Sequence, residues 1–318
     1  RGWRDRPLPA TGGAVAGIVV VCAALLVVWS QLVLQGQPLF DDEFTYRFQA
    51  QTLAAGWLAA PAPPCPACFE NVFIILRDGL WAGKYTSGHP ALLALSLPLG
   101  SPYVVTIVLG ALAPWLVWLV GREVAGPPTA FLAAAALVVS PFFVITASTL
   151  MNHATCLVFL AIFTLGYLRA RRGAGWAWAL AAGLALGVAF NIRPQSAVAV
   201  GLPFGVWTLA RLRGGGRPVL REGLLILAGL APLLVWAGYY NHVVSGSWYR
   251  FPFMMLEDAA PSALALLAPA GQGEPDHTLW KGLFYGLLNV WRLNLHLFGW
   301  GMSLIFVAVA LRRGPRDA

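Results

Sequence analysis

The residues best placed to do chemistry in this chain are three consecutive acids, Asp41, Asp42 and Glu43, which follow the first long apolar run. Carboxylates are costly to place near hydrocarbon, so acids at a membrane edge are candidates for a functional site. A carboxylate can take the proton from a hydroxyl group as that hydroxyl attacks a substrate. The alternative is an acidic helix end stabilised by the helix dipole.

Other polar side chains stand where later apolar runs begin or end. They are Lys84, Tyr85 and His89, then Asn152 and His153, then Arg193, and finally Tyr240, Asn241 and His242. Arg193 lies in a tight turn between two apolar segments, and a permanent cation there favours an anionic partner such as phosphate. Snorkelling at the membrane interface is the alternative for Lys84 and His89. Helix capping is the alternative for Asn152 and His153.

The segment around the acids has the spacing of a helix. Three phenylalanines, from Phe40 to Phe48, recur every four residues, whereas Asp42, Tyr46 and Gln49 lie along another face. This pattern predicts an amphipathic helix in the membrane interface. It also places Asp42 and Tyr46 one turn apart, where both side chains face a shared cavity.

The composition predicts the elements that hold these residues. Of the 318 residues, 58% are hydrophobic and 11% are charged, far fewer charges than the roughly 25% of soluble domains. Apolar runs long enough to cross a bilayer recur along the chain. We therefore expect an all-α polytopic membrane protein of about eight spans, with interfacial helices in the first outer segment. The expected spans are 13–34, 102–121, 128–149, 154–170, 175–191, 195–212, 220–240 and 289–311. The run 91–100 is short for a span, and we expect it to be interfacial or re-entrant.

The formal net charge of +8 reflects the placement of basic residues between the spans. Most of them fall in loops on the side of the N-terminus, and Lys and Arg in short loops mark the cytoplasmic side. Both termini are therefore expected in the cytoplasm, and the acids outside it. This bias accounts for the charge without a nucleic-acid partner. Two long outer segments, 35–101 and 242–288, are expected to carry the functional surface.

The cysteines have two expected settings. Cys22 and Cys156 lie within spans, where cysteine behaves as a small apolar residue. Cys65 and Cys68 lie in the first outer segment, where a local disulfide is one of two interpretations and unpaired thiols the other. A zinc site would need a second pair of ligands, which the sequence does not offer. Because the chain lacks an initiator Met and stops after an Arg-rich segment, we expect residues 1–318 to be one transmembrane module of a longer protein.

The order of these motifs resembles that of the GT-C glycosyltransferases. Specifically, the chain looks like the N-terminal membrane module of the dolichyl-phosphate-mannose–protein mannosyltransferase and aminoarabinose-transferase group. The matching features are Asp42-Glu43 with Tyr46, the segment Lys84–Pro90, Gly121-Arg122, Ser148–His153, and Tyr240-Asn241 through Gly246. The chain departs from the family at Thr86 and Ser87, where the family usually has proline, and at Asn152, near which many relatives have aspartate.

The resemblance implies a membrane glycosyltransferase, inverting and specific for hexosyl or pentosyl groups, in a GT-C-like bundle. It would use a polyprenyl-phosphate sugar as donor and a lipid, polysaccharide or protein as acceptor. It would act at the outer face of a bacterial-type plasma membrane.

The resemblance also implies roles for individual residues. Asp42 would be the catalytic base, with Asp41 a substitute and Glu43 in support. Lys84, His89 and Arg193 would face the donor phosphate. The expected substrate-binding residues are Tyr46, Tyr85, Asn152, His153, Tyr240, Asn241 and His242. No metal site is assigned, although a divalent cation (Mg²⁺ or Mn²⁺) bridged by Asp41 and Asp42 is an option.

Two other functions fit parts of the pattern. A transporter or lipid flippase would place ionisable residues at mid-bilayer depth, but here polar groups gather at the ends of the spans. A non-catalytic scaffold or an inactive fragment is the third hypothesis.

Overall fold

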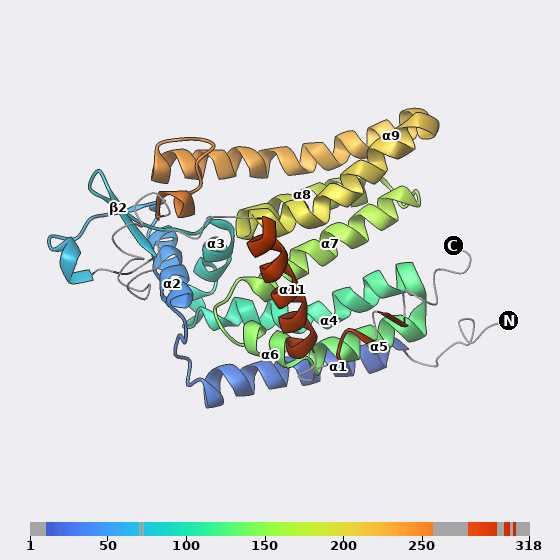
Figure 1. The fold of residues 1–318 in the computed structure, drawn as a ribbon, viewed down its shortest axis with the longest axis horizontal. Helices are drawn as coiled ribbons and strands as arrows, with labels where there is room; N and C mark the ends of the chain where they lie inside the picture. The colour runs from blue at the N-terminus through green and yellow to red at the C-terminus, as the bar shows by residue number, and fades with distance from the viewer. Residues whose placement is uncertain are drawn as a thin grey trace.

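The computed structural model describes residues 11–69, 71, 73–256, 279–297, 302–305 and 308–309. Its elements are α1 (Thr11–Val27), η2 (Val28–Val33), α2 (Asp41–Ala54), β1 (Ala60–Pro61), η3 (Pro66–Phe69), β2 (Ile74–Arg77), β3 (Leu80–Gly83), α3 (Gly88–Ala94), η4 (Leu97–Leu99), α4 (Tyr103–Ala125), α5 (Pro127–Val138), α6 (Pro141–Ala147), α7 (His153–Arg171), α8 (Trp176–Ile192), α9 (Pro194–Ser245) and α11 (Leu279–His296). Long helices run side by side, and α2, α3 and the strands gather at one end (Figure 1).

The long helices pack mainly against their neighbours in the sequence. The principal contacts join α1 to α4, α4 to α5 and α7, α7 to α8, and α8 to α9. Proline and glycine set several of the turns between them. Gly126 has a φ of 84°, and Pro127 begins α5 directly after it. Pro194 likewise begins α9 after Arg193, whose backbone is extended.

Glycines bring α8 and the second half of α9 into backbone contact. A Cβ added at Gly183 would lie 2.0 Å from the carbonyl oxygen of Ile226, and one at Gly229 would lie 2.4 Å from that of Leu180. Small residues that let backbones approach are the usual basis of helix packing in membranes. The helix α9 itself breaks at Gly216, whose φ is 55°. Its two halves therefore run back along each other.

The predicted spans coincide with described helices except the last. By length and hydropathy, four described helices can cross a membrane, or five if α5 and α6, which bend by 63°, form one broken span. The expected number of about eight is therefore not confirmed. The segment Gly88–Leu99 is a shorter apolar helix and not a full span, in agreement with the expectation for 91–100.

The predicted span 289–311 does not match a described helix. Instead α11 covers Leu279–His296 and lies across the long helices in Figure 1. Polar residues such as Lys281 and Arg292 interrupt its apolar sequence, so it does not meet the criteria for a span. Residues 298–301, 306–307 and 310–311 lie outside the described part of the chain, as do 257–278 of the expected second outer segment.

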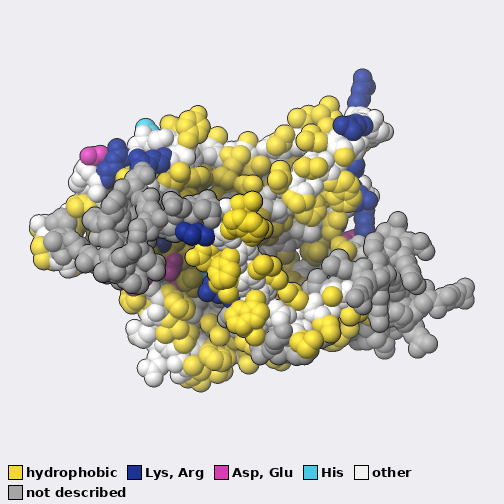
Figure 2. Space-filling model, in the orientation of Figure 1, with side chains coloured by type: hydrophobic (Ala, Val, Ile, Leu, Met, Phe, Trp, Pro, Cys, Tyr) yellow, Lys and Arg dark blue, Asp and Glu magenta, His cyan; other side chains and the backbone are white. Residues whose placement is uncertain are grey.

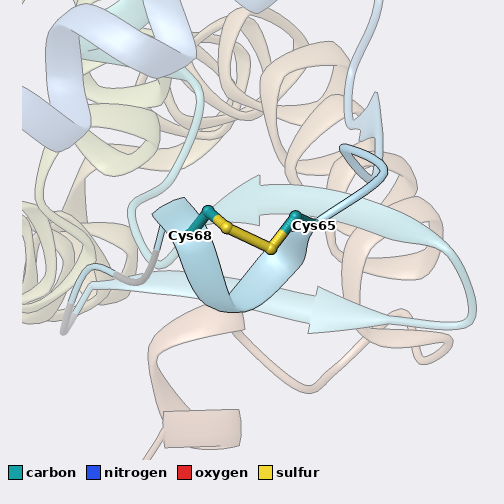
Figure 3. The surroundings of a disulfide bond; sticks show 2 residues. All are labelled: Cys65 and Cys68. Atoms are coloured by element: carbon teal, nitrogen blue, oxygen red, sulfur yellow. A yellow bond between two sulfur atoms is a disulfide. The ribbon is translucent and has the colours of Figure 1, made fainter.

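The first outer segment holds a small sheet as well as helices, a departure from the all-α expectation. Its strands are antiparallel in the order β1-β3-β2, and β2 pairs with β3 in the register Ile74 to Gly83. A disulfide joins Cys65 to Cys68 beside this sheet, so the disulfide interpretation holds (Figure 3). Phe40 and Phe44 at the start of α2 are about half exposed, as expected for a helix in the membrane interface.

The helix directions divide the polar residues between two ends of the bundle. One end, here the arginine-rich end, holds Arg122, Glu123, Arg169–Arg172 and Arg211–Glu222. The other, here the site end, holds α2, α3, the sheet, the start of α7 and the turn at Arg193. Hydrophobic side chains cover much of the face between the two ends (Figure 2).

Candidate active site

A cavity of about 330 Å³ opens at the site end. Its walls come from α2, the strand-to-helix connection after β3, the start of α7 and the α8–α9 turn. The lining residues are Asp42, Tyr46, Lys84, Tyr85, Thr86, Met151, Asn152, His153, Ile192, Arg193, Pro194, Gln195 and Phe253. Seven of the residues singled out from the sequence therefore meet in one space, although they come from four separate segments.

Asp42 is the carboxylate that faces this cavity. Its Oδ1 accepts a hydrogen bond from the Tyr85 hydroxyl. The ring of Tyr46 lies beside that of Tyr85, with centroids 4.2 Å apart. As the helical spacing predicts, Asp42 and Tyr46 line the same cavity. Burial raises the pKa of Tyr85, and its hydrogen bond to Asp42 raises it further. Tyr85 therefore stays a neutral donor that orients the carboxylate.

Lys84 presents a partly desolvated ammonium group to the same cavity. Its Nζ lies 3.1 Å from the centroid of the Phe73 ring and 4.9 Å from that of Tyr85. Burial lowers the pKa of Lys84, and the charge of Asp42 opposes that effect. Aromatic faces stabilise a cation without neutralising it. The ammonium group thus keeps charge available for an anion.

The hydrogen-bond partner of the Arg193 guanidinium group is the side-chain amide of Asn152 and not a carboxylate. Nη1 of Arg193 donates to Oδ1 of Asn152 over 3.1 Å, and Nδ2 of Asn152 donates to the Ile192 carbonyl over 3.4 Å. Asn152 precedes α7 as its N-cap residue, but its side chain makes no capping hydrogen bond. Side-chain capping was the alternative role for Asn152, and the geometry disagrees with it. Asn152 instead orients the guanidinium group at the cavity wall.

A close backbone contact couples the two cationic segments. A Cβ added at Gly88 would lie 2.6 Å from both the carbonyl carbon and the oxygen of Asn191. Thr86 also donates to the Ile192 carbonyl over 3.3 Å. The Lys84 segment is therefore packed directly on the end of α8, two residues before Arg193.

Glu43 does not reach the cavity, although the sequence grouped it with Asp42. Its side chain is fully buried and accepts N–H groups from Leu39, Phe40 and Leu150, over 3.0, 3.3 and 2.8 Å. Burial raises the pKa of Glu43, while these three backbone donors lower it. Glu43 thus ties the start of α2 to the turn before α7. Asp41, two residues before Glu43, is exposed and does not line the cavity.

His89, expected to face a donor phosphate, is also fully buried. Its Nε2 lies 2.7 Å from the Leu150 carbonyl, and its ring meets the edge of Tyr46 at 4.8 Å. Burial lowers the pKa of His89 to about 4, so the imidazole is neutral and Nε2–H donates to that carbonyl. A ligand in the cavity has no direct contact with His89, because α3 turns the side chain into the protein.

The expected substrate residues near the end of α9 also lie away from the cavity. Tyr240 is buried and receives a hydrogen bond from Nε2 of Gln49 over 2.8 Å. The same amide nitrogen donates to the Tyr85 carbonyl over 2.8 Å. Asn241 is buried and donates to the Trp248 carbonyl, and His242 stacks on Trp248. Tyr240 therefore supports the backbone of Tyr85 from behind the cavity.

Several lining residues were not singled out from the sequence. They are Thr86, Met151, Ile192, Pro194, Gln195 and Phe253, with Phe73 behind Lys84. Most are neighbours in the chain of residues that were singled out. Phe73 lies in an irregular stretch without periodicity, so no sequence signal pointed to it.

The carboxylates do not fit a divalent cation bridged by Asp41 and Asp42. Asp42 alone among them lines the cavity, and consecutive residues of a helix do not face each other. Mg²⁺ and Ca²⁺ take six or more oxygen ligands. Within the described residues, no three His, Cys, Asp or Glu side chains come together. We therefore derive no step through a metal ion.

Fold and cavity together define a class: a helical membrane protein with an acid and two cations facing a cavity at one end of its bundle. The family model of dolichyl-phosphate-mannose-protein mannosyltransferase matches residues 92–236. The resemblance to the dolichyl-phosphate-mannose–protein mannosyltransferase group, expected from the motifs, is thereby confirmed over these residues. No curated protein matches the chain.

Several solved structures share the fold, among them two from Archaeoglobus fulgidus. The first is the archaeal oligosaccharyltransferase AglB from Archaeoglobus fulgidus, in complex with an inhibitory peptide and a dolichol-phosphate. It is 14% identical with a TM-score of 0.50, and the match covers 93% of this chain and 39% of AglB. The second is the Archaeoglobus fulgidus oligosaccharyltransferase in the apo form, also 14% identical with a TM-score of 0.50, covering 97% of this chain and 37% of that one. This chain spans about two fifths of the length of each.

Proposed function

We propose that the cavity transfers a sugar from a polyprenyl-phosphate donor to a hydroxyl group of an acceptor. The observation that carries this proposal is the convergence of Asp42, Lys84 and Arg193 on one cavity. A base and two cations are what such a transfer requires. The lipid-linked donor is suggested by the family match and by the dolichol-phosphate bound to AglB.

The proposed reaction is a single displacement with inversion at the anomeric carbon. The acceptor oxygen attacks that carbon while its proton passes to Asp42. The bond between the carbon and the phosphate oxygen breaks, and its electron pair leaves with the polyprenyl phosphate. Arg193 and Lys84 stabilise the charge that develops on this leaving group. Tyr85 and Asn152 orient the base and the guanidinium group through the hydrogen bonds described above.

The charge distribution supports an orientation for the reaction. The arginine-rich end would lie in the cytoplasm and the site end outside it, in a bacterial-type plasma membrane. Nucleotide sugars are absent outside the cytoplasm, so a lipid-linked donor fits this orientation. The acceptor would be a lipid, a polysaccharide or a protein.

Substitutions of the adjacent residues Asp41 and Asp42 test the proposed role of Asp42 as the base. Because Asp42 faces the cavity and Asp41 does not, Asp42→Asn should lower the rate of transfer by about 10²–10⁴-fold. Asp41→Asn, the matched control, should transfer at close to the unchanged rate. Both variants should insert and fold normally. The assay is sugar transfer by the full chain in proteoliposomes, with a panel of polyprenyl-phosphate hexoses and pentoses.

The same assay separates the alternatives. Equal activity of the two variants would remove Asp42 as the base. Movement of the lipid donor across the bilayer without any transfer would favour the flippase hypothesis instead.

A further inference from the structure

A second cavity, lined in part by arginines, lies at the arginine-rich end, remote from the candidate active site. It has a volume of about 620 Å³ and lies between the α7–α8 turn and the break in α9. Its polar lining comprises Arg171, Arg211, Arg217, Arg221 and Glu222. Its size is within the roughly 300–1,000 Å³ of ligand-binding clefts. The proposed glycosyl transfer makes no use of it.

The charges of this cavity are only partly neutralised by the protein. Nη1 and Nη2 of Arg211 donate to the two carboxylate oxygens of Glu222 over 3.0 and 3.3 Å. Glu222 is thus neutralised and does not repel an anion. Arg217 and Arg221 are exposed, and neither forms an ion pair within the described residues. The guanidinium carbon of Arg171 lies over the Trp207 ring, 4.2 Å from its centroid, an arrangement that leaves the charge uncancelled.

An apolar groove continues from the arginines along the bundle. Its volume is about 480 Å³, and its walls come from α7, α8 and both halves of α9. Val219 lines both cavities. The rim includes Leu209, Leu220, Leu224 and Leu227, each with about half or more of its surface exposed.

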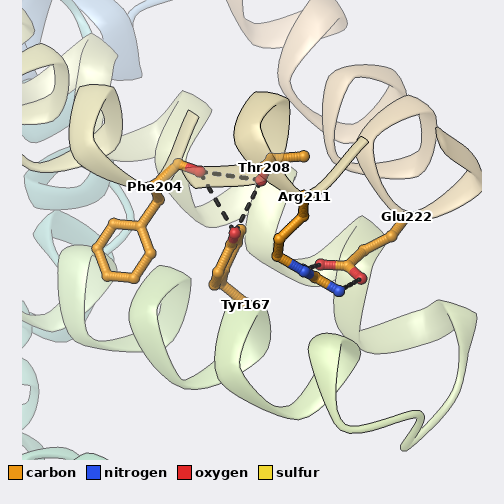
Figure 4. A network of polar contacts seen from close by, with 5 residues as sticks. All are labelled: Tyr167, Phe204, Thr208, Arg211 and Glu222. Carbon is orange, nitrogen blue, oxygen red and sulfur yellow. Dashed lines mark hydrogen bonds and ion pairs between the residues drawn. The ribbon is translucent and has the colours of Figure 1, made fainter. Parts of the chain in front are cut away.

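Hydrogen bonds within the protein hold the polar groups at the floor of this groove. The hydroxyls of Tyr167 and Thr208 lie 2.8 Å apart, and both bond the Phe204 carbonyl, beside the Arg211–Glu222 pair (Figure 4). These polar groups are therefore satisfied within the protein and leave the groove surface apolar. A Cβ added at Gly205 would meet no atom within 4 Å, so this part of the groove is open.

We propose that the two cavities together bind one anionic phospholipid. Its phosphate would lie among Arg171, Arg217 and Arg221, and an acyl chain would lie in the groove. Basic pockets between helices bind anionic head groups in this way. A free anion would not account for the adjoining apolar groove, and a neutral lipid would not account for the unpaired arginines. The site lies at the opposite end of the bundle from Asp42, so it does not depend on the proposed transferase activity.

Retention of phosphatidylglycerol by the full chain in detergent, measured by native mass spectrometry, tests this proposal. The double variant Arg217→Gln/Arg221→Gln should weaken retention about thirtyfold. Each arginine near an anionic lipid strengthens binding by a factor of about 5.5, and the two factors multiply. Arg213→Gln is its matched control. Arg213 is also exposed and lies close to the break in α9 at Gly216, but it does not line the cavity.

The groove has its own variant and control. Gly205→Leu should fill the groove and lower retention, whereas Gly17→Leu on α1 should not, because its Cβ also meets open space but lies away from both cavities. Phosphatidylcholine should be retained less than phosphatidylglycerol by the unsubstituted chain.

Three outcomes would overturn the proposal. One is an equal loss in Arg213→Gln and in the double variant, which would show diffuse attraction to the basic surface. Another is equal retention of phosphatidylcholine. The third is displacement of the lipid by millimolar inorganic phosphate, which would show a site for the anion alone. Size-exclusion profiles of each variant confirm that it is folded.

Discussion

The two ends of the helix bundle use the same residue types in opposite ways. At the arginine-rich end the described carboxylates are paired, Glu123 with Arg169 and Arg172, and Glu222 with Arg211. At the site end Asp42 is bonded to the Tyr85 hydroxyl and Arg193 to the Asn152 amide. Neutral partners fix the direction of a charged group while leaving its charge uncancelled. The site end is therefore marked as the candidate active site by neutral partners that leave its charges available, and not by the number of its charges.

After the loss predicted above for Asp42→Asn, the largest effect expected from this comparison is on Arg193. Replacing one group that stabilises developing charge costs about 100-fold or more in rate. Arg193→Ala should therefore lower transfer about 100-fold with saturating acceptor and raise the apparent KM for the polyprenyl-phosphate donor. Initial rates at varied donor concentration measure both quantities.

Arg47 on α2 supplies the control, because it is exposed and does not line the cavity. If Arg47→Ala and Arg193→Ala impaired donor use equally, the charge of Arg193 would have no special role.

A second prediction separates Glu43 from Asp42. Each oxygen of Glu43 accepts at least one backbone N–H group, so the amide of Glu43→Gln would place a donor against a donor. An unsatisfied buried group costs about 1–3 kcal/mol, and the free energy of unfolding should fall by that amount. Thermal unfolding in detergent measures the loss. A variant of unchanged stability with abolished transfer would instead give Glu43 a catalytic role.

The third prediction concerns the pH dependence of donor binding. Because burial lowers the pKa of Lys84, its positive charge is lost at a lower pH than that of an ordinary lysine. Donor affinity should therefore decline as pH rises through that lowered pKa. Lys84→Arg keeps the charge at all accessible pH values and should move the decline to higher pH. Profiles of the donor KM against pH compare the two chains, and superimposable profiles would contradict the role of Lys84.

The smallest effect is expected at the arginine-rich end. The Arg172 side chain is 57% exposed, and exposed ion pairs contribute about 0–1 kcal/mol. Arg172→Ala should therefore change the thermal unfolding temperature little and leave sugar transfer unchanged. A large loss of transfer in this variant would mean that the arginine-rich end also takes part in the reaction.

Periodicity and chain position were enough to predict part of the site. The four-residue spacing of α2 placed Asp42 and Tyr46 at one cavity, and the shortness of the turn singled out Arg193. Most of the long helices themselves followed from long apolar runs, although their number as spans did not. Each of these signals lies within a single segment of the chain, so it can be recognised without knowledge of the fold.

Burial was not predictable in the same way, because it depends on segments distant in the sequence. Glu43 points to the backbone of Leu150, and His89 to the carbonyl of that residue. No residue close in sequence to Glu43 or His89 indicates that Leu150 is the partner of both. The small sheet and the contact between Phe73 and Lys84 arise from an irregular stretch, where hydrophobic spacing carries no information.

The contact of Gly88 with Asn191 has a consequence for how the cavity can change. Since the backbone of Gly88 meets the backbone and the Cβ of Asn191 there, the spacing between the Lys84 segment and the Arg193 turn does not depend on long side chains. In the proposed transferase the two cations would therefore move together, and space for a larger sugar would have to come from movement of α2. Substitutions around either cation would leave the distance between the two segments unchanged, as long as position 88 remains a glycine.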